Sequence, residues 1–458
     1  MSSESGSTNG GNGGAKPYSG YHNRPRAAER NPLAETGPGT PGGEYLRRFW
    51  HPFMLVSELA DLPVPVRLLG EDLVVFRDGG GRLGLLHRQC IHRGASLEFG
   101  IVAERGIRCC YHGWLYDVDG TVLETPAEPA ASPLKHELCQ GAYPVREACG
   151  LIFAYMGPPE TMPELPLYDT FSQRADNVLA PFKLHFPCNW VQIVDNAADP
   201  IHNAYLHAIV SGQQFSPAFA VLPALDFVET PLGFLSMATR RVKDSVFIRA
   251  SDMIMPNIGQ FLSGSNNATE ECFGIASYLT RWVVPLDDTS SFYMGVANLN
   301  PYTTKHRPMR PEDFGVGRVA LIGQTADRPY TERQREPGDF DALVSQGAIQ
   351  NRKAEHLGTT DRGVVMFRRM LARGIKAVEA GEPLALPRRY AQNPVPTYCH
   401  DLVMRLPSQS NIADLASIGA FGRRAAQIVI ETDGLAAPER ERVAHERIKR
   451  LVTTDLVG

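Results

Sequence analysis

Two short motifs, each combining one cysteine with one histidine, constrain the fold of this 458-residue chain more than any other feature. Cys90 and His92 form Cys-x-His, and Cys109 and His112 form Cys-x2-His. Thiolates suit iron–sulfur clusters and zinc, and imidazole suits either metal. A two-iron cluster with cysteines on one iron and histidines on the other needs this mixture, whereas zinc modules usually pair Cys with Cys and His with His. The spacing therefore favours an iron–sulfur cluster over structural zinc.

One of the four ligands is ambiguous, because a third cysteine stands beside the second motif. Cys110-x-His112 repeats the spacing of Cys90-x-His92, so the residues alone do not choose between Cys109 and Cys110. The chain has eight cysteines but no hydrophobic N-terminal stretch that could serve as a secretion signal. A disulfide framework is therefore not expected.

The composition divides the chain into three parts. Residues 1–43 are rich in Gly, Ser, Asn and Pro, and we expect a disordered tail. Residues 44–160 contain short strand patterns separated by tight turns, which predict a small antiparallel β domain. Residues 161–458 mix β-rich runs with helical patterns over Asp341–Leu357 and Asp361–Gly381. The predicted fold class is α+β.

Charge and hydropathy exclude several classes of protein. Lys plus Arg is 46 and Asp plus Glu is 50, which gives a net charge of −4 and argues against a nucleic-acid binder that relies on positive charge. No apolar run approaches the roughly 20 residues of a membrane span. We expect a cytoplasmic protein without a membrane or nucleic-acid partner.

A second constellation lies between Asn189 and His207. Asp195, Asp199 and His202 have helical spacing, but His207 follows His202 by five residues, too far around a regular helix for two ligands of one site. A helix end or distortion must therefore separate them. Two histidines and one carboxylate are typical of non-haem Fe(II) oxygenases. The alternative is a pair of ordinary polar histidines.

Both constellations resemble those of the Rieske ring-hydroxylating oxygenases. The pattern C-x-H-x15–17-C-x2-H is similar to the Rieske domain of that family, as are the flanking segments HRGASL and YHGW. The motif D-x2-H-x4-H, carried by Asp199, His202 and His207, and the preceding NWVQ resemble its catalytic domain. The resemblance implies that Cys109 binds the [2Fe-2S] cluster and that Cys110 is a buried bystander near it.

The resemblance also implies roles for the second constellation. His202 and His207 would bind a mononuclear Fe(II), and Asp199 would bridge His202 to a Rieske histidine, His112, of a neighbouring subunit. The third iron ligand would be an aspartate far downstream. Alignment from the segment EHLGTTD, which resembles phthalate-dioxygenase-type enzymes, favours Asp339. Spacing to a later glutamine favours Asp341 instead, and a helix N-terminus would explain either carboxylate.

The implied fold is a Rieske domain followed by a helix-grip (START-like) catalytic domain. The implied activity is that of an oxygenase component, phthalate 4,5-dioxygenase-like, which uses O2 to hydroxylate an aromatic substrate, with or without a carboxylate. Electrons would come from a separate NAD(P)H-dependent reductase of flavin or ferredoxin type, and the chain would form a homotrimer or hexamer. The alternatives are O- or N-demethylation by a related oxygenase and a zinc-stabilised binding protein.

Overall fold

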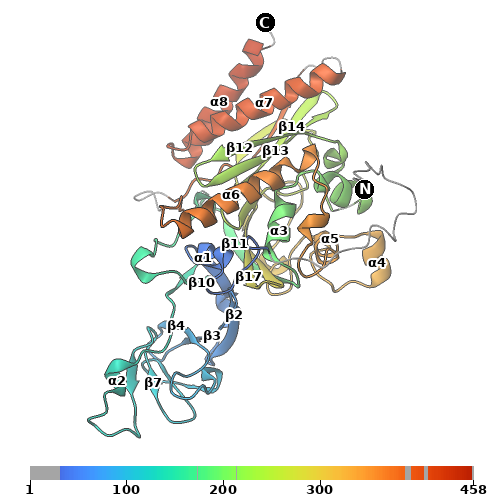
Figure 1. Cartoon of the computed structure of the whole chain (residues 1–458). Helices are drawn as coiled ribbons and strands as arrows, with labels where there is room; N and C mark the ends of the chain where they lie inside the picture. Colours follow the sequence, from blue (N-terminus) through green and yellow to red (C-terminus); the bar gives the residue numbers. More distant parts are fainter. Residues whose placement is uncertain (1–30, 173, 213, 387–393, 407–410, 456–458) are drawn as a thin grey trace, which may run out of the picture.

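The computed structural model describes residues 31–172, 174–212, 214–386, 394–406 and 411–455. Three small antiparallel sheets build the N-terminal part, which forms the lower end of the molecule in Figure 1. Their strands are β1 (Trp50–Leu55), β10 (Leu151–Tyr155) and β9 (Val145–Ala148); β2 (Val64–Leu68), β3 (Glu71–Arg77) and β4 (Leu83–His87); and β5 (Ile101–Val102), β6 (Ile107–Arg108), β7 (Leu115–Tyr116) and β8 (Val122–Glu124).

A nine-stranded antiparallel sheet forms the second part, with the order β11-β18-β17-β15-β14-β13-β12 and with β19 pairing β14 and β16. Its strands are β11 (Val178–Phe186), β12 (Ala224–Thr230), β13 (Gly233–Val242), β14 (Ser245–Ile254), β15 (Ile258–Phe261), β16 (Cys272–Ile275), β17 (Leu279–Asp287), β18 (Ser290–Leu299) and β19 (His400–Arg405). Long antiparallel strands with helices packed against them confirm the predicted α+β class.

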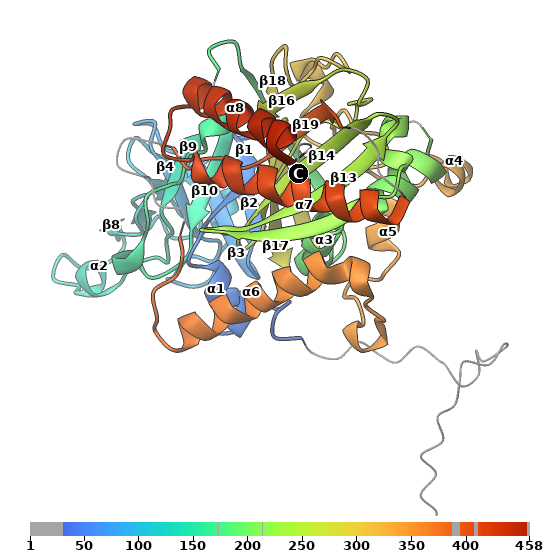
Figure 2. The ribbon, with the colours of Figure 1, turned by 90° about the horizontal axis from the view of Figure 1, so that it is seen from above.

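Two long C-terminal helices cover part of this sheet. Helices α7 (Asn411–Glu431) and α8 (Ala437–Asp455) cross it in Figure 2, and their apolar side chains form one buried cluster with β13 and β14. The other helices are α1 (Pro41–Leu46), α2 (Leu134–Glu137), α3 (Trp190–Ala197), α4 (Tyr330–Arg335), α5 (Asp339–Val344) and α6 (Arg362–Glu379). Among the described residues, no helix has the length and apolarity to cross a membrane.

The hydrophobic core is continuous between the two parts. One buried cluster extends from Trp50 and Phe153 to Trp282 on β17, where the Phe153 and Trp282 rings meet edge to face. The backbone N–H groups of Leu69 and Gly70 donate to the carbonyls of Pro285 and Leu286 on β17. This interface places the small sheets at one end of the large one.

Two predictions of local structure need correction. Residues 31–43 of the expected tail are ordered, because Thr36 donates from its amide and hydroxyl to Asp288 and its carbonyl accepts from Arg47; residues 1–30 lie outside the described residues. The helix predicted over Asp341–Leu357 ends at Val344. The side-chain amide of Gln192 donates hydrogen bonds to the carbonyl oxygens of Leu343 and Gly347. In a longer helix these carbonyls would accept from backbone N–H groups of the helix instead.

Candidate functional site: two metal-binding constellations

Two tight turns present the cysteine–histidine motifs at the tip of the N-terminal part. One follows β4 and the other joins β6 to β7. Gly94 donates to the carbonyl of Cys90, and Gly113 donates to that of Cys109. Both glycines have positive φ angles, +76° and +73°, a conformation that favours glycine. The sequence thus builds two matching loops.

The four predicted ligands converge between these loops. The two cysteine sulfurs face the protein interior, and the two histidine rings lie closer to the surface. The thiols of Cys90 and Cys109 are buried, and burial together with the adjacent Cys90 raises the pKa of Cys109. The rings of His92 and His112 are half-buried, with centroids 4.6 Å apart, and His92 stacks on Trp114. Two thiols that face two imidazoles fit a cluster with mixed ligands.

The two adjacent cysteines differ in their surroundings. Cys109 is buried beside Cys90, whereas Cys110 is exposed. The expectation that Cys110 is buried near the cluster is therefore wrong. Only Cys109 of the two therefore faces the partner loop.

Polar groups from neighbouring segments hold the first loop. The Tyr116 hydroxyl lies 2.9 Å from the Cys90 sulfur. The buried Gln140 side chain accepts from the amide of Ile91 and donates to the carbonyls of His87 and Gln89. Hydrogen bonds of this kind orient metal ligands and tune the bound metal.

The second constellation begins where helix α3 ends. Asn189 caps the first turn of α3, which stops at Ala197, and the chain turns at Pro200. A π-helix, η6 (Asn203–Val210), follows. A π-helix closes hydrogen bonds between residues five apart, so it brings His202, immediately before it, and His207 onto one side. The predicted distortion between the two histidines is present.

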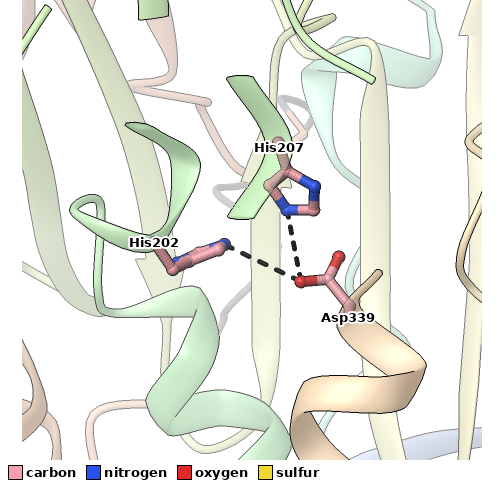
Figure 3. Close-up of side chains that lie close together, drawn as sticks. All are labelled: His202, His207 and Asp339. Carbon is pink, nitrogen blue, oxygen red and sulfur yellow. Dashed lines mark ion pairs between the residues drawn. The ribbon is translucent and has the colours of Figure 1, made fainter. Parts of the chain in front are cut away.

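The side chains of His202, His207 and Asp339 meet at one point (Figure 3). The Asp339 Oδ1 atom lies 3.2 Å from His207 Nε2 and 3.8 Å from His202 Nε2. The three potential ligand atoms all lie within 4.8 Å of one another. Two imidazole nitrogens and one carboxylate oxygen are the donor set of a facial iron triad.

The pKa values in this cluster follow from burial and charge together. Burial alone would raise the pKa of Asp339, but the two histidines and Gln324 hold it well below its usual range. Burial lowers the pKa of His202, and Asp339 only partly opposes this effect. For His207, the attraction of Asp339 outweighs burial and raises the pKa.

Acceptors behind both histidines fix the orientation of the rings. The Nδ1 atom of His207 donates to Gln214 Oε1 at 2.6 Å, and that of His202 donates to the carbonyl of Asp199. Each histidine is therefore left with Nε2 directed at Asp339. This arrangement selects the tautomer that a metal needs.

The other downstream candidate, Asp341, does not reach the histidines. Its carboxylate accepts from the amide of Gly338 at the start of α5 and pairs with Arg333 at 2.6 Å. Asp339 lies in the same first turn of α5 but on the side that faces η6.

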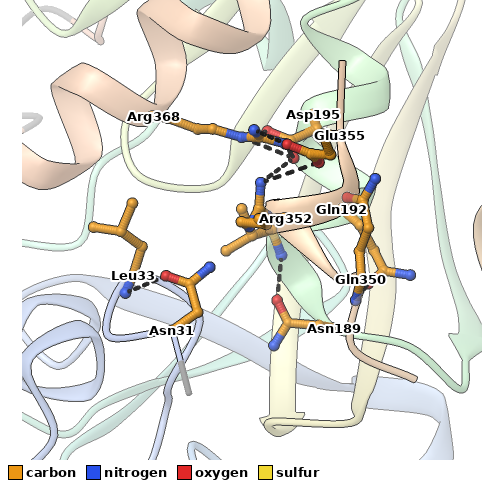
Figure 4. A network of polar contacts seen from close by, with 10 residues as sticks. Asn31, Leu33, Asn189, Gln192, Asp195, Gln350, Arg352, Glu355 and Arg368 are labelled. Atoms are coloured by element: carbon orange, nitrogen blue, oxygen red, sulfur yellow. Dashed lines mark hydrogen bonds and ion pairs between the residues drawn. The ribbon is translucent and has the colours of Figure 1, made fainter. Parts of the chain in front are cut away.

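Asp195 and Asp199 have separate surroundings. The side chain of Asp195, on α3, forms ion pairs with Arg352 at 3.0 Å and with Arg368 at 2.6 Å. These residues belong to a largely buried polar network (Figure 4). Burial still raises its pKa, although both arginines oppose this effect. The half-buried Asp199 carboxylate lies 3.9 Å from His202 Nδ1 and accepts from the amide of Ile201.

Sequence reasoning missed the residues that support the triad. Gln324 donates to Asp339 Oδ2 at 2.7 Å, and Asn196 donates to Oδ1 at 3.3 Å. Gln214 supports His207 as described above. Asn196 is adjacent to Asp195 in the motif region and could have been singled out. Single glutamines outside any motif give no signal.

A cavity of about 130 Å³ opens onto the triad. Its wall is mainly apolar and aromatic, and it includes Phe215, Phe261, Tyr278, Leu279 and Tyr293. An apolar cavity of about 150 Å³ can hold benzene. The space is thus suited to a small organic molecule beside the three ligand side chains.

Comparisons with known proteins agree with this geometry. Residues 49–140 match the model of the Rieske [2Fe-2S] domain. The chain is 42% identical to the tert-butanol monooxygenase / tert-amyl alcohol desaturase oxygenase subunit of Aquincola tertiaricarbonis, covering 92% of this chain and 94% of that one. It is 38% identical to the phenoxybenzoate dioxygenase subunit alpha of Ectopseudomonas oleovorans (76% and 85%). It is 32% identical to the phthalate 4,5-dioxygenase oxygenase subunit of Pseudomonas putida (75% and 84%).

The solved structure of a Pseudomonas putida NdmA mutant with caffeine shares the fold, with a TM-score of 0.56 at 21% identity, over 75% of this chain and 94% of that one. Both constellations therefore lie in a fold that relatives share along nearly the whole chain. The chain belongs to the Rieske non-haem iron oxygenases, as an oxygenase (alpha) subunit of the type that includes phthalate 4,5-dioxygenase.

Proposed function

We propose that this chain hydroxylates a small aromatic substrate with oxygen from O2, as the oxygenase component of a multi-protein system. The observation that carries the proposal is the cavity beside His202, His207 and Asp339, whose aromatic wall suits one ring. When bound, the cluster supplies single electrons and the mononuclear iron supplies the site of O2 activation. Members of this family receive their electrons from a separate reductase, and we assign an NAD(P)H-dependent flavin or ferredoxin type.

The chain's own residues divide the work. Cys90, His92, Cys109 and His112 would hold the [2Fe-2S] cluster, and His202, His207 and Asp339 the mononuclear Fe(II). The residues behind them keep these donors in place, because their hydrogen bonds fix ring and carboxylate orientation. Phe215 stacks on His207 and, with the other rings of the wall, gives the cavity an apolar side next to the ligands.

We assign Asp199 the role of a bridge between His202 and the Rieske domain of a neighbouring subunit. Its backbone carbonyl already accepts from His202 Nδ1, and its carboxylate is partly exposed. Asp199→Asn should therefore keep both metals but slow electron transfer from the reduced cluster to the mononuclear site at least about tenfold. Rapid-freeze spectroscopy after reduced, substrate-loaded enzyme is mixed with O2 measures how fast the signal of the reduced cluster is lost, and an unchanged rate would refute the bridge.

A cyclic homotrimer, alone or doubled into a hexamer, is part of the proposal. In such a ring the Rieske ligands of one subunit would meet η6 of the next subunit. Apolar side chains are exposed at both of these surfaces, and large exposed apolar patches are typical of protein interfaces. Near the Rieske ligands they are Ile91, Phe99, Ile101 and Tyr111, and on η6 they are Tyr205, Ile209 and Val210. Native mass spectrometry should give three or six chain masses of 50.3 kDa; a monomer would contradict this part. The cytoplasmic location likewise remains a proposal.

Labelled O2 tests the reaction type. With anaerobically loaded enzyme, a reductase and an aromatic substrate, two labelled oxygens in a cis-diol indicate dioxygenation and one in a phenol indicates monooxygenation. One labelled oxygen with release of formaldehyde indicates demethylation, the alternative within the family. No label in any product would refute the proposed function.

A second candidate follows from the relative of Aquincola tertiaricarbonis, whose name states that it acts on tert-butanol and tert-amyl alcohol. Its 42% identity extends over 92% of this chain, and a cavity of about 130 Å³ would also hold a branched alcohol. Product formation from tert-butanol, measured beside benzoate under the same conditions, separates the two candidates.

A further inference from the structure

A thioether lies in the wall of the cavity beside the triad. Among the described residues that line this cavity, Met309 is the only one that contains sulfur. The sulfur of methionine readily takes up one oxygen atom and becomes a sulfoxide. A cavity that opens onto the proposed site of O2 activation therefore carries an oxidisable group in its own wall.

A second wall residue holds this sulfur in place. Met309 lies between β18 and the short helix η8 (Pro311–Asp313), half-buried against the main hydrophobic core. Its Sδ atom accepts a hydrogen bond from the Tyr278 hydroxyl at 2.9 Å. Tyr278 lines the same cavity. The thioether is thus fixed at the cavity by a partner that also faces the cavity.

The same hydroxyl can serve the oxidised side chain. A sulfoxide is polar, and a polar atom that is buried without a hydrogen bond is costly. Burial raises the pKa of Tyr278, so its hydroxyl keeps the proton at neutral pH and can donate to the sulfoxide oxygen. The site therefore accommodates both the reduced and the oxidised form of Met309.

The other methionines that the structure describes have different surroundings. Met162 is 37% exposed and does not line the cavity, and Met366 and Met370 lie on α6. Seven are buried away from the cavity, namely Met54, Met156, Met237, Met253, Met255, Met294 and Met404. An oxidant in the bulk solvent should thus reach Met162 first, whereas an oxidant released in the cavity should reach Met309 first.

We propose that Met309 is the residue that this enzyme oxidises when O2 is reduced at the triad without a substrate in the cavity. The inference rests on one part of the proposed function, the reduction of O2 at this site. O2 takes up two protons and two electrons, one from each iron centre, and leaves as hydrogen peroxide. The Met309 sulfur then bonds to one peroxide oxygen, the O–O bond breaks, and the other oxygen leaves as water with both protons. The sulfur is thereby oxidised by two electrons.

The modification would mark enzyme that has turned over without substrate. A sulfoxide oxygen makes the wall more polar at the place where an aromatic ring would lie. Methionine sulfoxide is also reversible, since sulfoxide reductases restore the thioether. Met309 is therefore a modification site and not a catalytic residue in this account.

Peptide mass spectrometry of the metal-loaded enzyme tests this inference. The cluster is reduced with stoichiometric dithionite, no organic substrate is added, and O2 is introduced together with catalase, which destroys peroxide in the bulk solvent. After several cycles, a gain of about 16 Da should appear at Met309 in a fraction at least about tenfold larger than at Met162. Hydrogen peroxide added to the unreduced enzyme without catalase should reverse this order, because Met162 is the exposed one.

Asp339→Ala is the matched variant, because it should keep the cluster but lose the mononuclear iron, and it should show no gain at Met309. If this variant does not fold, wild-type protein with zinc in place of the mononuclear iron decides in the same way, since zinc has no redox chemistry. A gain at Met309 that persists without the iron would overturn the inference. Equal oxidation of Met309 and Met162 in the reduced wild type, or the same order with added peroxide, would also overturn it.

O2 uptake separates this inference from the proposed function. Labelled product from an aromatic substrate, with O2 uptake but no gain at Met309 in its absence, would refute this inference and leave the proposed function standing. A gain at Met309 without labelled product from any substrate would support this inference and refute the proposed hydroxylation. No O2 uptake by the loaded, reduced enzyme would refute both.

Discussion

The Nε2 atom of His207 lies 3.2 Å from the Oδ1 atom of Asp339, although the two residues come from separate helices, η6 and α5. The Nε2 atom of His202 lies 3.8 Å from the same Asp339 oxygen. This junction places the proposed mononuclear iron site between the motif region and a segment that carries no recognisable motif.

Asp339→Ala should remove the mononuclear iron and leave the cluster in place, because the two remaining histidines provide too few ligands. The iron-to-sulfide ratio should fall from about 3:2 to about 2:2, as measured by iron and acid-labile sulfide analysis. Asp341→Ala is the matched control, since Asp341 pairs with Arg333 instead. A loss of iron in the control but not in Asp339→Ala would reverse the assignment.

The two adjacent cysteines allow an equally direct comparison. Cys109→Ser should lose the visible absorption of the cluster, because a buried ligand is replaced by a weak one. Cys110→Ser should retain it, because Cys110 is exposed. Absorption spectra after anaerobic reconstitution of both variants measure this difference, and the opposite pattern would show that Cys110 is the ligand.

Tyr116→Phe should lower the reduction potential of the cluster. The Tyr116 hydroxyl lies 2.9 Å from the Cys90 sulfur, and a hydrogen bond to a ligand sulfur stabilises the reduced, more negative state. The loss of one such bond corresponds to about 50 mV for a one-electron couple. Protein-film voltammetry can measure the shift. Tyr143→Phe serves as control, because that hydroxyl binds Glu71; an equal shift in both variants would contradict the role of Tyr116.

The buried carboxyl of Asp252 should make stability depend on pH. Burial raises its pKa to about 7, an effect that Asp169 adds to and that the Tyr398 amide and Arg440 oppose. The unfolded carboxyl loses its proton near pH 4. Between these values the folded state binds more protons, so the free energy of unfolding falls as pH rises, by up to about 1.4 kcal/mol per pH unit.

Asp252→Asn should therefore lose less stability than the wild type between pH 5 and pH 8. Urea unfolding at three pH values in this range measures the difference, with the exposed Asp61 changed to Asn as control. Parallel curves for the wild type and Asp252→Asn would show that Asp252 does not titrate in this range.

The sequence predicted those parts of the structure that short-range chemistry determines. The hairpin of β3 and β4, the α+β class, and a distortion between His202 and His207 all follow from turns, strand patterns and ligand spacing. The helix Arg362–Glu379 likewise follows its apolar period and stops before Gly381, whose φ is +68°.

Features that depend on tertiary contacts were not predictable in this way. The choice of Asp339 over Asp341 depends on which side of α5 faces η6, and the sequence does not give that orientation. The short length of α5 depends on Gln192, which comes from α3.

Iron, zinc and acid-labile sulfide per chain, measured on the wild type after anaerobic reconstitution, test the central claim most directly. Two iron centres on one polypeptide predict about three irons, about two sulfides and no stoichiometric zinc, in a reddish-brown solution. A colourless protein with about one zinc and no sulfide would contradict the account.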